Sequence, residues 1–248
     1  MTRTASACGI IIIAHRGASA VAPESTEAAI REAARSGAGM VELDVQMTRD
    51  GRLVIFHDDR LERTTDGIGA VTDTRYAVLS RLDAGSWFQP RFAGQRILLV
   101  SQALRLIPSR MRVNLELKRT AKRRALLQQF LRTVRRAGIN RRLLISSFDH
   151  RLLAPLASSG LARALICRRD PDRSLGRAIR LGCAAWHPFH ALVTPRRVAQ
   201  AHAAGLAVRA WAVDDAVRAK RLAACGVDGI FTNDPERLAR AFTRRAAS

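Results

Sequence analysis

Short apolar runs alternate with helical patterns along almost the whole chain. The run Ile10–Ala14 leads to a helical pattern from about Thr26, and the run Met40–Val45 follows. The later runs that we expect to be strands are Arg112–Lys118, Leu143–Ser147, Ala164–Cys167, Ala184–His187, Ala207–Val213 and Gly229–Thr232. Strands that alternate with helices in this way predict an α/β protein with a parallel sheet. Eight such units in 248 residues favour a TIM (β/α)8 barrel, which typically has about 250 residues.

A ninth apolar run, Leu53–His57, departs from this alternation. Only Gln46–Arg52 separates it from the second expected strand, whereas a parallel crossover needs about a dozen residues or more. The separating segment contains Asp50-Gly51, a pair typical of tight hairpin turns. We therefore predict an antiparallel hairpin that opens a small inserted cap between the second strand and the second helix, at about residues 46–95. With this insertion, residues 1–248 are expected to form a single domain.

Acidic residues stand where a barrel carries its functional groups, at the C-terminal ends of strands. Glu42 and Asp44 occupy alternate positions of one expected strand, so their side chains point to the same face. Glu116 and Lys118 repeat this spacing on the next barrel strand. Buried carboxylates repel one another, and a divalent cation on their oxygens would relieve the repulsion. We predict that Glu42, Asp44 and Glu116 bind one Mg²⁺ or Ca²⁺ ion; the alternative is that they form ion pairs with arginines or with Lys118.

Two histidines are expected near these acids. His15 and Arg16 directly follow the first strand, where Gly17 lets the chain turn sharply, and His57 ends the returning strand of the hairpin. Imidazoles transfer protons near neutral pH, while Arg16 and Lys118 would offset the charge of phosphate oxygens. Together with a metal ion, these groups are typical of a site for phosphoryl transfer. The alternative is a structural role for each histidine, at a strand end or in a turn.

A set of short motifs contains all of these candidate residues. The motifs are His15-Arg16-Gly17-Ala18-Ser19, Ala22-Pro23-Glu24, Val41-Glu42-Leu43-Asp44-Val45, Asp50-Gly51, His57-Asp58, Arg63-Thr64-Thr65-Asp66-Gly67, Asn114-Leu115-Glu116-Leu117-Lys118 and Trp211. They resemble the signatures of the glycerophosphodiester phosphodiesterase family. The resemblance covers about residues 10–240, and the first sixty residues are its most specific part. It implies a metal-dependent TIM barrel that hydrolyses glycerophosphodiesters to glycerol 3-phosphate and an alcohol.

The resemblance also implies a role for each candidate residue, carried over position by position. Trp211 is the least determined of them, because a tryptophan at its position would equally well fill the barrel interior. The implied roles are acid–base catalysis for His15 and His57, metal binding for Glu42, Asp44 and Glu116, phosphate binding for Arg16 and Lys118, and a wall of the substrate pocket for Trp211.

Two segments depart from the family pattern. Ser25 stands where family members usually have asparagine, and we expect its hydroxyl to cap the helix that begins near Thr26. Leu98–Gln102 reads Leu-Leu-Val-Ser-Gln, where the family usually has Pro-Thr-Leu-Glu-Glu. The second departure removes two acids and leaves the start of the following helix undetermined.

Four histidines lie outside the motifs. His187 and His190 flank Pro188-Phe189 after an expected strand. Their position is compatible with contact to the substrate, but we expect them to belong to loop structure. His150 and His202 fall in helical patterns and are expected at the surface.

The motifs do not explain the strong positive charge. The chain has 42 basic and 21 acidic residues, for a net charge of +21, and all but three of the basic residues are arginines. From Arg119 to Arg142 there are nine basic residues and no acidic one, yet Leu127, Phe130 and Val134 recur at helical spacing. This pattern predicts an outer helix with one buried apolar face and one solvated basic face. The alternative is that the basic face makes weak contact with an anionic membrane.

Two other functions are compatible with the sequence. A phospholipase that acts on lysophospholipids would use the same fold and the same site, with the basic surface docked on a membrane. A basic nucleic-acid-binding protein would require the carboxylate trio to be structural. No helix-turn-helix, RNA-binding or zinc motif accompanies the charge, so we expect no nucleic-acid partner. Ile10–Ala14 is too short for a membrane span or a secretory signal, and we expect the protein to be cytoplasmic.

Overall fold

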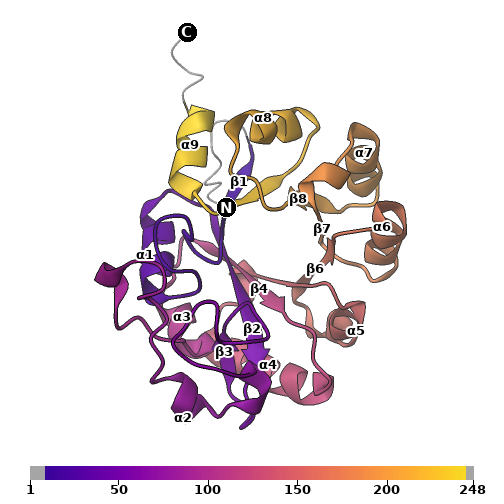
Figure 1. Ribbon diagram of the computed structural model, residues 1–248. Coiled ribbons are helices and arrows are strands. Elements are labelled where there is room, and N and C mark those ends of the chain that lie inside the picture. The colour runs from indigo at the N-terminus through magenta and orange to yellow at the C-terminus, as the bar shows by residue number, and fades with distance from the viewer. Residues whose placement is uncertain (1–8, 244–248) are drawn as a thin grey trace.

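Eight parallel strands close into a barrel within residues 9–243, the part of the chain that the computed structural model describes (Figure 1). Successive strands along the chain are neighbours, and the last one pairs with the first. The strands are β1 (Ile11–His15), β2 (Met40–Met47), β4 (Arg112–Leu117), β5 (Leu143–Ser147), β6 (Ala162–Cys167), β7 (Ala185–Pro188), β8 (Ala207–Ala210) and β9 (Gly229–Thr232). The predicted TIM (β/α)8 barrel is confirmed. The extent of the domain over all 248 residues stays a prediction.

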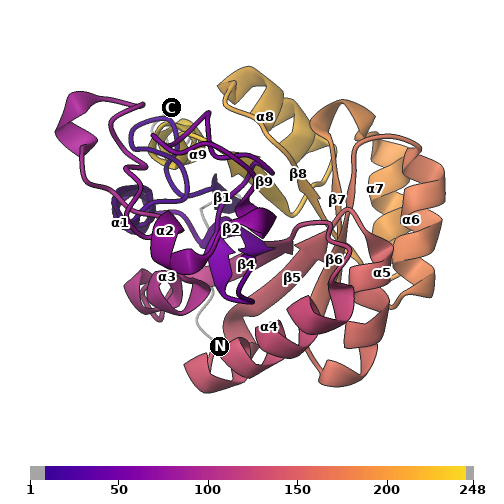
Figure 2. The ribbon, with the colours of Figure 1, turned by 60° about the horizontal axis from the view of Figure 1, so that its bottom comes forward.

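Helices form the outer layer around these strands, as Figures 1 and 2 show from two directions. The α-helices are α1 (Glu27–Arg35), α2 (Tyr76–Leu79), α3 (Val100–Leu106), α4 (Arg123–Ala137), α5 (His150–Leu153), α6 (Pro171–Arg180), α7 (Pro195–Ala203), α8 (Ala216–Ala224) and α9 (Pro235–Thr243). Short 3-10 turns cover Val71–Asp73, Pro90–Phe92, Asn140–Arg142, Ala154–Ser159 and His190–Leu192. The helices α7 and α8 each end shortly before a glycine, Gly205 and Gly226, whose left-handed φ angles of 76° and 90° are typical of a C-terminal helix cap.

The closed ring determines which strands face each other. Going round the barrel, β2 is followed by β4, β5, β6 and β7 in one direction, and by β1, β9, β8 and β7 in the other. Strand β7 is therefore four positions from β2 either way and lies on the opposite side of the barrel. The walls around β2 and around β7 face each other across the interior.

Side chains alternate between the two faces of each strand, and β2 shows this clearly. Val41, Leu43 and Val45 belong to the large apolar cluster between the strands and the helices. Met40 packs instead with Ile13 and Phe231 in the barrel interior. The residues that alternate with the outward valines and leucine therefore point inward, and these are the positions of the predicted metal ligands.

The predicted hairpin follows β2. Strand β3 (Leu53–Ile55) pairs antiparallel with the end of β2, with Val45 opposite Ile55 and Met47 opposite Leu53. Gly51 in the turn has a φ of 76°, a left-handed conformation that favours glycine. The strand is shorter than the expected run, so His57 lies just beyond its end.

The remainder of the insertion packs around a small apolar cluster of its own. Its buried members are Val54, Phe56, Leu61, Val71, Leu79, Ala84 and Ile97. Figure 1 shows α2 at the periphery, beyond β2 and β3. The inserted segment is thus held by its own core at one side of the barrel.

The start of α1 differs from the expectation, and the structure defines the start of α3, which the sequence left undetermined. Thr26, not Ser25, caps α1, because its hydroxyl accepts a hydrogen bond from Ala29 N. Ser25 has a left-handed φ of 63°, and its hydroxyl lacks a hydrogen-bond partner among the described residues. At α3, Gln102 Oε1 accepts from Leu99 N at 2.7 Å. An amide therefore caps this helix where the family usually has an acid.

The basic segment after β4 forms α4 as the pattern predicts. Leu126, Leu127, Phe130 and Val134 are its buried residues. Within residues 9–243, no helix combines the length and the hydrophobicity needed to cross a membrane.

Candidate active site

One cavity of about 400 Å³ opens at the C-terminal ends of the barrel strands. All eight residues predicted for the site line it: His15, Arg16, Glu42, Asp44, His57, Glu116, Lys118 and Trp211. His57 is the contribution of the inserted segment to this lining. Residues from three strands, from the segment after the hairpin and from the loops after β1, β4 and β8 are therefore brought together as the sequence suggested.

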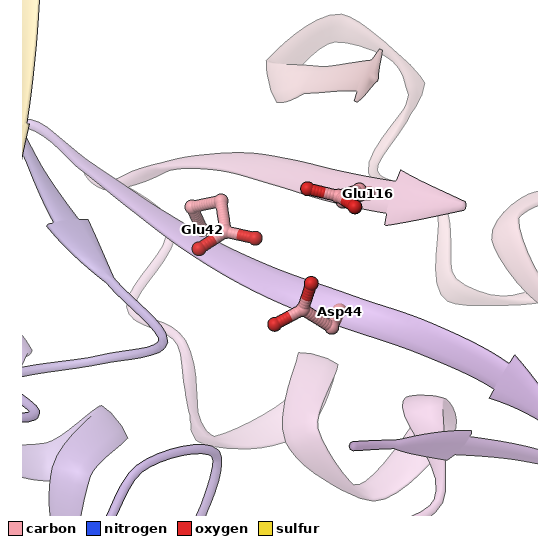
Figure 3. Close-up of side chains that lie close together, drawn as sticks. All are labelled: Glu42, Asp44 and Glu116. Carbon is pink, nitrogen blue, oxygen red and sulfur yellow. The ribbon is translucent and has the colours of Figure 1, made fainter. Parts of the chain in front are cut away.

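Three carboxylates lie on adjacent strands of one wall. Glu42 and Asp44 point inward from β2, and Glu116 lies beside Asp44 in the register of β2 and β4 (Figure 3). One oxygen of each carboxylate lies within 4.8 Å of one oxygen of each of the others. Glu42 and Asp44 are buried, and Glu116 is nearly so. Such a spacing suits oxygen ligands around a single small cation.

Two cations border the trio. Lys118 Nζ lies 3.0 Å from Glu116 Oε1 and 3.3 Å from Asp44 Oδ1. Arg16 Nε lies 3.6 Å from Asp44 Oδ2, too far for a well-formed hydrogen bond. The trio thus keeps part of its negative charge uncompensated by the protein.

The pKa values of the three carboxyls respond to this arrangement. Burial, together with the charges of Asp44 and Glu116, raises the pKa of Glu42 well above its usual value. Burial and the neighbouring Asp44 raise the pKa of Glu116 to about 7. Burial opposes ionisation of Asp44 too, but Lys118, His57 and Arg16 hold its pKa below the usual value. One negative charge is therefore stable on Asp44, and further charges need another cation.

The donor set matches a divalent cation. Asp44 Oδ2 is buried and has no hydrogen-bond partner in the part of the chain that the structure describes. An ion among the three carboxylates would use this oxygen and would relieve the repulsion that raises the pKa values of Glu42 and Glu116. Oxygen-only donors favour hard cations such as Mg²⁺ and Ca²⁺.

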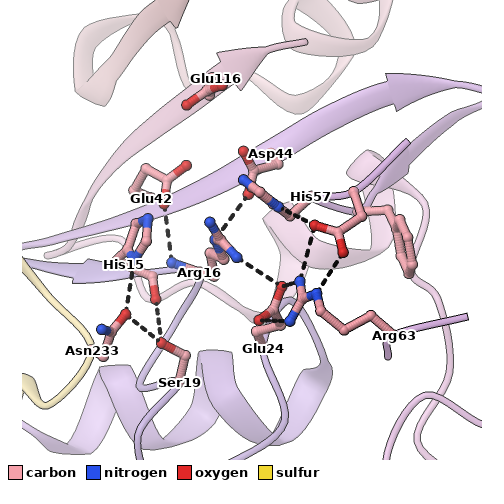
Figure 4. Close-up of polar contacts among 12 residues, drawn as sticks. His15, Arg16, Ser19, Glu24, Glu42, Asp44, His57, Arg63, Glu116 and Asn233 are labelled. Atoms are coloured by element: carbon pink, nitrogen blue, oxygen red, sulfur yellow. Dashed lines mark hydrogen bonds and ion pairs between the residues drawn. The ribbon is translucent and has the colours of Figure 1, made fainter. Parts of the chain in front are cut away.

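His15 is held in one orientation by a chain of hydrogen bonds (Figure 4). Its Nδ1 lies 2.8 Å from Asn233 Oδ1, which also accepts from Ser19 Oγ. Asn233 Nδ2 donates to Asp214 at 2.7 Å. Because the amide oxygen accepts, Nδ1 of His15 carries the proton and Nε2 keeps its lone pair. Burial and the nearby Arg16 lower the pKa of His15 to about 4, so the ring is neutral at pH 7.

His57 is connected to Arg16 through a network of ion pairs, also drawn in Figure 4. His57 Nδ1 contacts Asp58 Oδ1 at 2.5 Å, and Arg63 binds both Asp58 and Glu24. Glu24 in turn accepts a hydrogen bond from Arg16 Nη1 at 3.0 Å. Glu24, Asp58 and Arg63 belong to the motifs, but the sequence did not indicate that they join His57 to Arg16.

The turn after β1 positions Arg16 through backbone strain. Arg16 has a left-handed φ of 58°, and its backbone N–H donates to Glu42 Oε2 at 3.0 Å. Gly17 follows with a φ of 84°, and a Cβ there would lie 2.7 Å from the backbone and side chain of Ala29. Glycine is therefore required for β1 to turn against α1.

Aromatic rings form the wall around β7 and β8. Trp211 Nε1 donates to the backbone oxygen of His187 at 2.9 Å. The indole makes edge contacts with Phe148 and Phe189, with ring centroids 5.6 Å and 5.4 Å apart. The orientation of Trp211 is thus fixed by a hydrogen bond and by two rings.

Seven lining residues were not predicted: Asn114, Ser146, Phe148, Ile166, Arg168, His187 and Phe231. The expectation that His187 belongs to a loop is wrong, because it lies within β7 and is only 1% exposed. Neither of its ring nitrogens has a hydrogen-bond partner within the described range, and Asn114 Oδ1 also lacks one. Each such buried atom costs about 1–3 kcal/mol when it is left unpaired. Alternation along the strand was the available signal, since Asn114 stands two residues before Glu116.

The same fold and sequence pattern occur in known proteins. The profile of the "Glycerophosphoryl diester phosphodiesterase family" matches residues 15–237. A glycerophosphodiester phosphodiesterase of Caldanaerobacter subterraneus subsp. tengcongensis is 34% identical over 232 residues, which are 92% of this chain and 96% of the relative.

Solved structures show the same similarity. A phosphodiesterase from Oleispira antarctica, in complex with the product sn-glycerol-3-phosphate, has a TM-score of 0.88 and 33% identity, and the match covers 93% of this chain and 96% of the other. A glycerophosphodiester phosphodiesterase from Agrobacterium tumefaciens has a TM-score of 0.82 and 29% identity over 93% of this chain and 99% of its own. The chain therefore belongs to the glycerophosphoryl diester phosphodiesterase family.

Proposed function

We propose that this chain hydrolyses glycerophosphodiesters to glycerol 3-phosphate and an alcohol. The observation that carries the proposal is a cavity whose lining includes the three carboxylates, the imidazoles of His15 and His57, and the cationic side chains of Arg16 and Lys118. The Oleispira antarctica phosphodiesterase, which has the same fold, holds sn-glycerol-3-phosphate as its product. A diester of glycerol phosphate is the substrate class that both lines of support favour.

The carboxylate trio would hold the cofactor, one divalent cation. Glu42, Asp44 and Glu116 supply the oxygens, and Lys118 bridges Asp44 and Glu116. When bound, an Mg²⁺ or Ca²⁺ ion offsets charge on the phosphate oxygens and so favours attack at phosphorus. The hard oxygen donors and the acidic Asp44 favour these two ions over soft metals.

Arg16 and Lys118 are the phosphate-binding residues in this proposal. Both side chains line the cavity and are largely buried, and each is paired with carboxylates. Positive charges that are fixed before the substrate arrives stabilise the charge that builds up on phosphate without further rearrangement. Trp211, oriented by His187 O and two rings, forms the wall against which the substrate packs.

The two histidines differ in their hydrogen-bond partners, and this difference supports a separate role for each in the proposal. His15 is neutral with a free Nε2 lone pair, so it accepts the proton of the nucleophile, which is water or a neighbouring glycerol hydroxyl. His57 is hydrogen-bonded to Asp58, whose carboxylate favours the protonated ring, while burial and the charges of Arg16 and Lys118 lower the pKa of His57 below its usual value and make the protonated ring a readier proton donor. His57 therefore gives its proton to the oxygen of the leaving alcohol as the phosphorus–oxygen bond breaks.

The direct test is the release of glycerol 3-phosphate from glycerophosphocholine, measured with Mg²⁺ or Ca²⁺ and again with EDTA. We expect turnover with the cation, loss of turnover with the chelator, and recovery when the cation is added back in excess. No release with either cation would refute the function, whereas full turnover in EDTA would refute only the metal site. Faster cleavage of lysophosphatidylcholine would support the phospholipase alternative.

A further inference from the structure

His187 is a buried polar side chain that the proposed chemistry does not use. It points into the cavity from β7, is 1% exposed, and packs against Phe231 with ring centroids 5.0 Å apart. Neither Nδ1 nor Nε2 is hydrogen-bonded to any residue that the structure describes. Burial, and secondly the charge of Arg209, hold the pKa of His187 well below its usual value. The ring is therefore neutral, with one N–H donor and one lone pair that both lack partners.

The position of β7 places this ring on the side of the cavity away from Glu42 and Asp44. Glu42 and Asp44 stand on β2, and β7 is diametrically opposite β2 in the ring of strands. With the phosphate beside Arg16 and Lys118, an organic part of the substrate must extend across the interior. A cavity of about 400 Å³ is large enough for a group of a few carbon atoms.

The surroundings of His187 select the chemistry of that group. Arg209 lies close enough for its charge to act on His187, so a cationic head group such as choline is disfavoured there. The rings of Phe231 and Trp211 suit the carbon chain of the ligand. Asn114 Oδ1 is a second unpaired buried atom in the lining of the same cavity. A small neutral polyol, which has both hydroxyls and C–H groups, satisfies all of these surfaces.

We propose that His187 is a binding residue for the glycerol hydroxyls, and that it selects glycerol phosphoesters over phosphoesters of simple alcohols. This inference rests on the proposed function, because it assumes that a glycerol phosphoester occupies the cavity. His187 donates one hydrogen bond and accepts another, so an alcohol without hydroxyls at these positions leaves both ring nitrogens buried and unpaired. Sites built in this way discriminate strongly against the analogue that lacks the hydroxyl.

The test compares two ligands that differ only in the two hydroxyls, sn-glycerol 3-phosphate and n-propyl phosphate. Their dissociation constants are measured by calorimetry with the cation that supports turnover. We expect the wild-type protein to bind glycerol 3-phosphate at least about tenfold more tightly. In His187→Phe the preference should fall to about twofold or less, and His187→Gln, which keeps a donor and an acceptor, should recover part of it.

His190→Phe is the matched control, because His190 contacts Phe189 and Arg218 rather than the cavity; it should keep the wild-type preference. Equal binding of the two phosphates by the wild-type protein, or an unchanged preference in His187→Phe, would overturn the inference. Turnover of glycerophosphocholine together with equal binding of the two phosphates would refute the hydroxyl-binding role of His187 and leave the proposed function. Selective binding without any release of glycerol 3-phosphate would refute the proposed function and leave the subsite.

Discussion

Replacing Glu116 by glutamine should stabilise the metal-free protein while it abolishes the response to metal. The folded protein holds the pKa of Glu116 at about 7, against a usual value of 4.5, because the carboxyl is buried beside Asp44. Each pKa unit corresponds to about 1.36 kcal/mol. Ionising Glu116 in the folded state at pH 8 therefore costs about 3 kcal/mol relative to the unfolded chain. Glutamine has nearly the same shape and carries no charge.

The pH dependence follows from the sign of this shift. The folded state holds the proton of Glu116 more tightly than the unfolded chain, so wild-type stability decreases as the pH rises from 4.5 through about 7. The stability of Glu116→Gln should not show this part of the decrease, and the stabilities of the two proteins should become equal below pH 4.5. At roughly 2–4 °C per kcal/mol for a chain of this size, the variant should melt about 6–12 °C higher at pH 8 in EDTA.

Thermal unfolding with and without Mg²⁺ or Ca²⁺ measures both the stability of the metal-free protein and its response to the metal. The wild-type melting temperature should rise with the cation, because only the folded state gathers the three ligands. Glu116→Gln should gain much less, since one ligand is gone. Glu32→Gln, at an exposed pair with Arg35 on α1, should behave like the wild type in both conditions. A variant that melts below the wild type in EDTA at pH 8, or that keeps the full metal response, would refute the reasoning.

Two further predictions concern proton transfer and the turn after β1. His57→Ala should lower turnover of glycerophosphocholine at least about 10²-fold. It should lower turnover of bis(4-nitrophenyl) phosphate much less, because nitrophenolate leaves without a proton. His15→Ala should slow the turnover of both substrates, and the same pattern of losses in the two variants would contradict the proposed roles. Gly17→Ala should lower the free energy of unfolding in urea by about 2–5 kcal/mol, from a left-handed φ and a clash with α1. Gly51 also has a left-handed φ, but the space around it is open, so Gly51→Ala should lower the free energy of unfolding by only about 1–2 kcal/mol. Similar losses of stability at both positions would exclude the clash as the cause.

The charged half of the site could be predicted because it depends on local rules. Two acids at alternate positions of a strand share a face whatever the rest of the fold does, and parallel strands bring their ends to one edge. Glu42, Asp44 and Glu116 satisfy both conditions. His57 was placed through the hairpin, whose turn residues and short spacing left only an antiparallel pairing.

The uncharged polar residues of the cavity, Asn114 and His187, were not predicted, because their surroundings depend on side chains from several strands. Alternation along β7 places His187 on the inner face, and the order of the strands in the ring sets β7 opposite β2, but neither shows what the imidazole contacts there. Whether a buried imidazole has a partner depends on side chains from distant strands, and the sequence contains no signal for a missing partner. The prediction for Ser25 was wrong for a similar reason: the sequence does not show that Ser25 adopts a left-handed φ and that the next residue, Thr26, caps the helix.

The charge balance of the site explains why selectivity for glycerol must come from uncharged contacts. Three carboxylates surround the proposed ion position, while Arg16 and Lys118 supply two positive charges beside them. A bound divalent cation would leave these five side chains with one net positive charge, and Arg168 adds a further cation to the lining of the cavity, so the site attracts an anionic phosphate group. Glycerol 3-phosphate carries close to two negative charges above pH 6 or so, so the same positive groups also attract the product. Charge interactions in a poorly solvated cavity are strong, but they act on the phosphate and do not distinguish glycerol from another alcohol. In the proposed site, the hydroxyl contacts at His187 supply this selectivity.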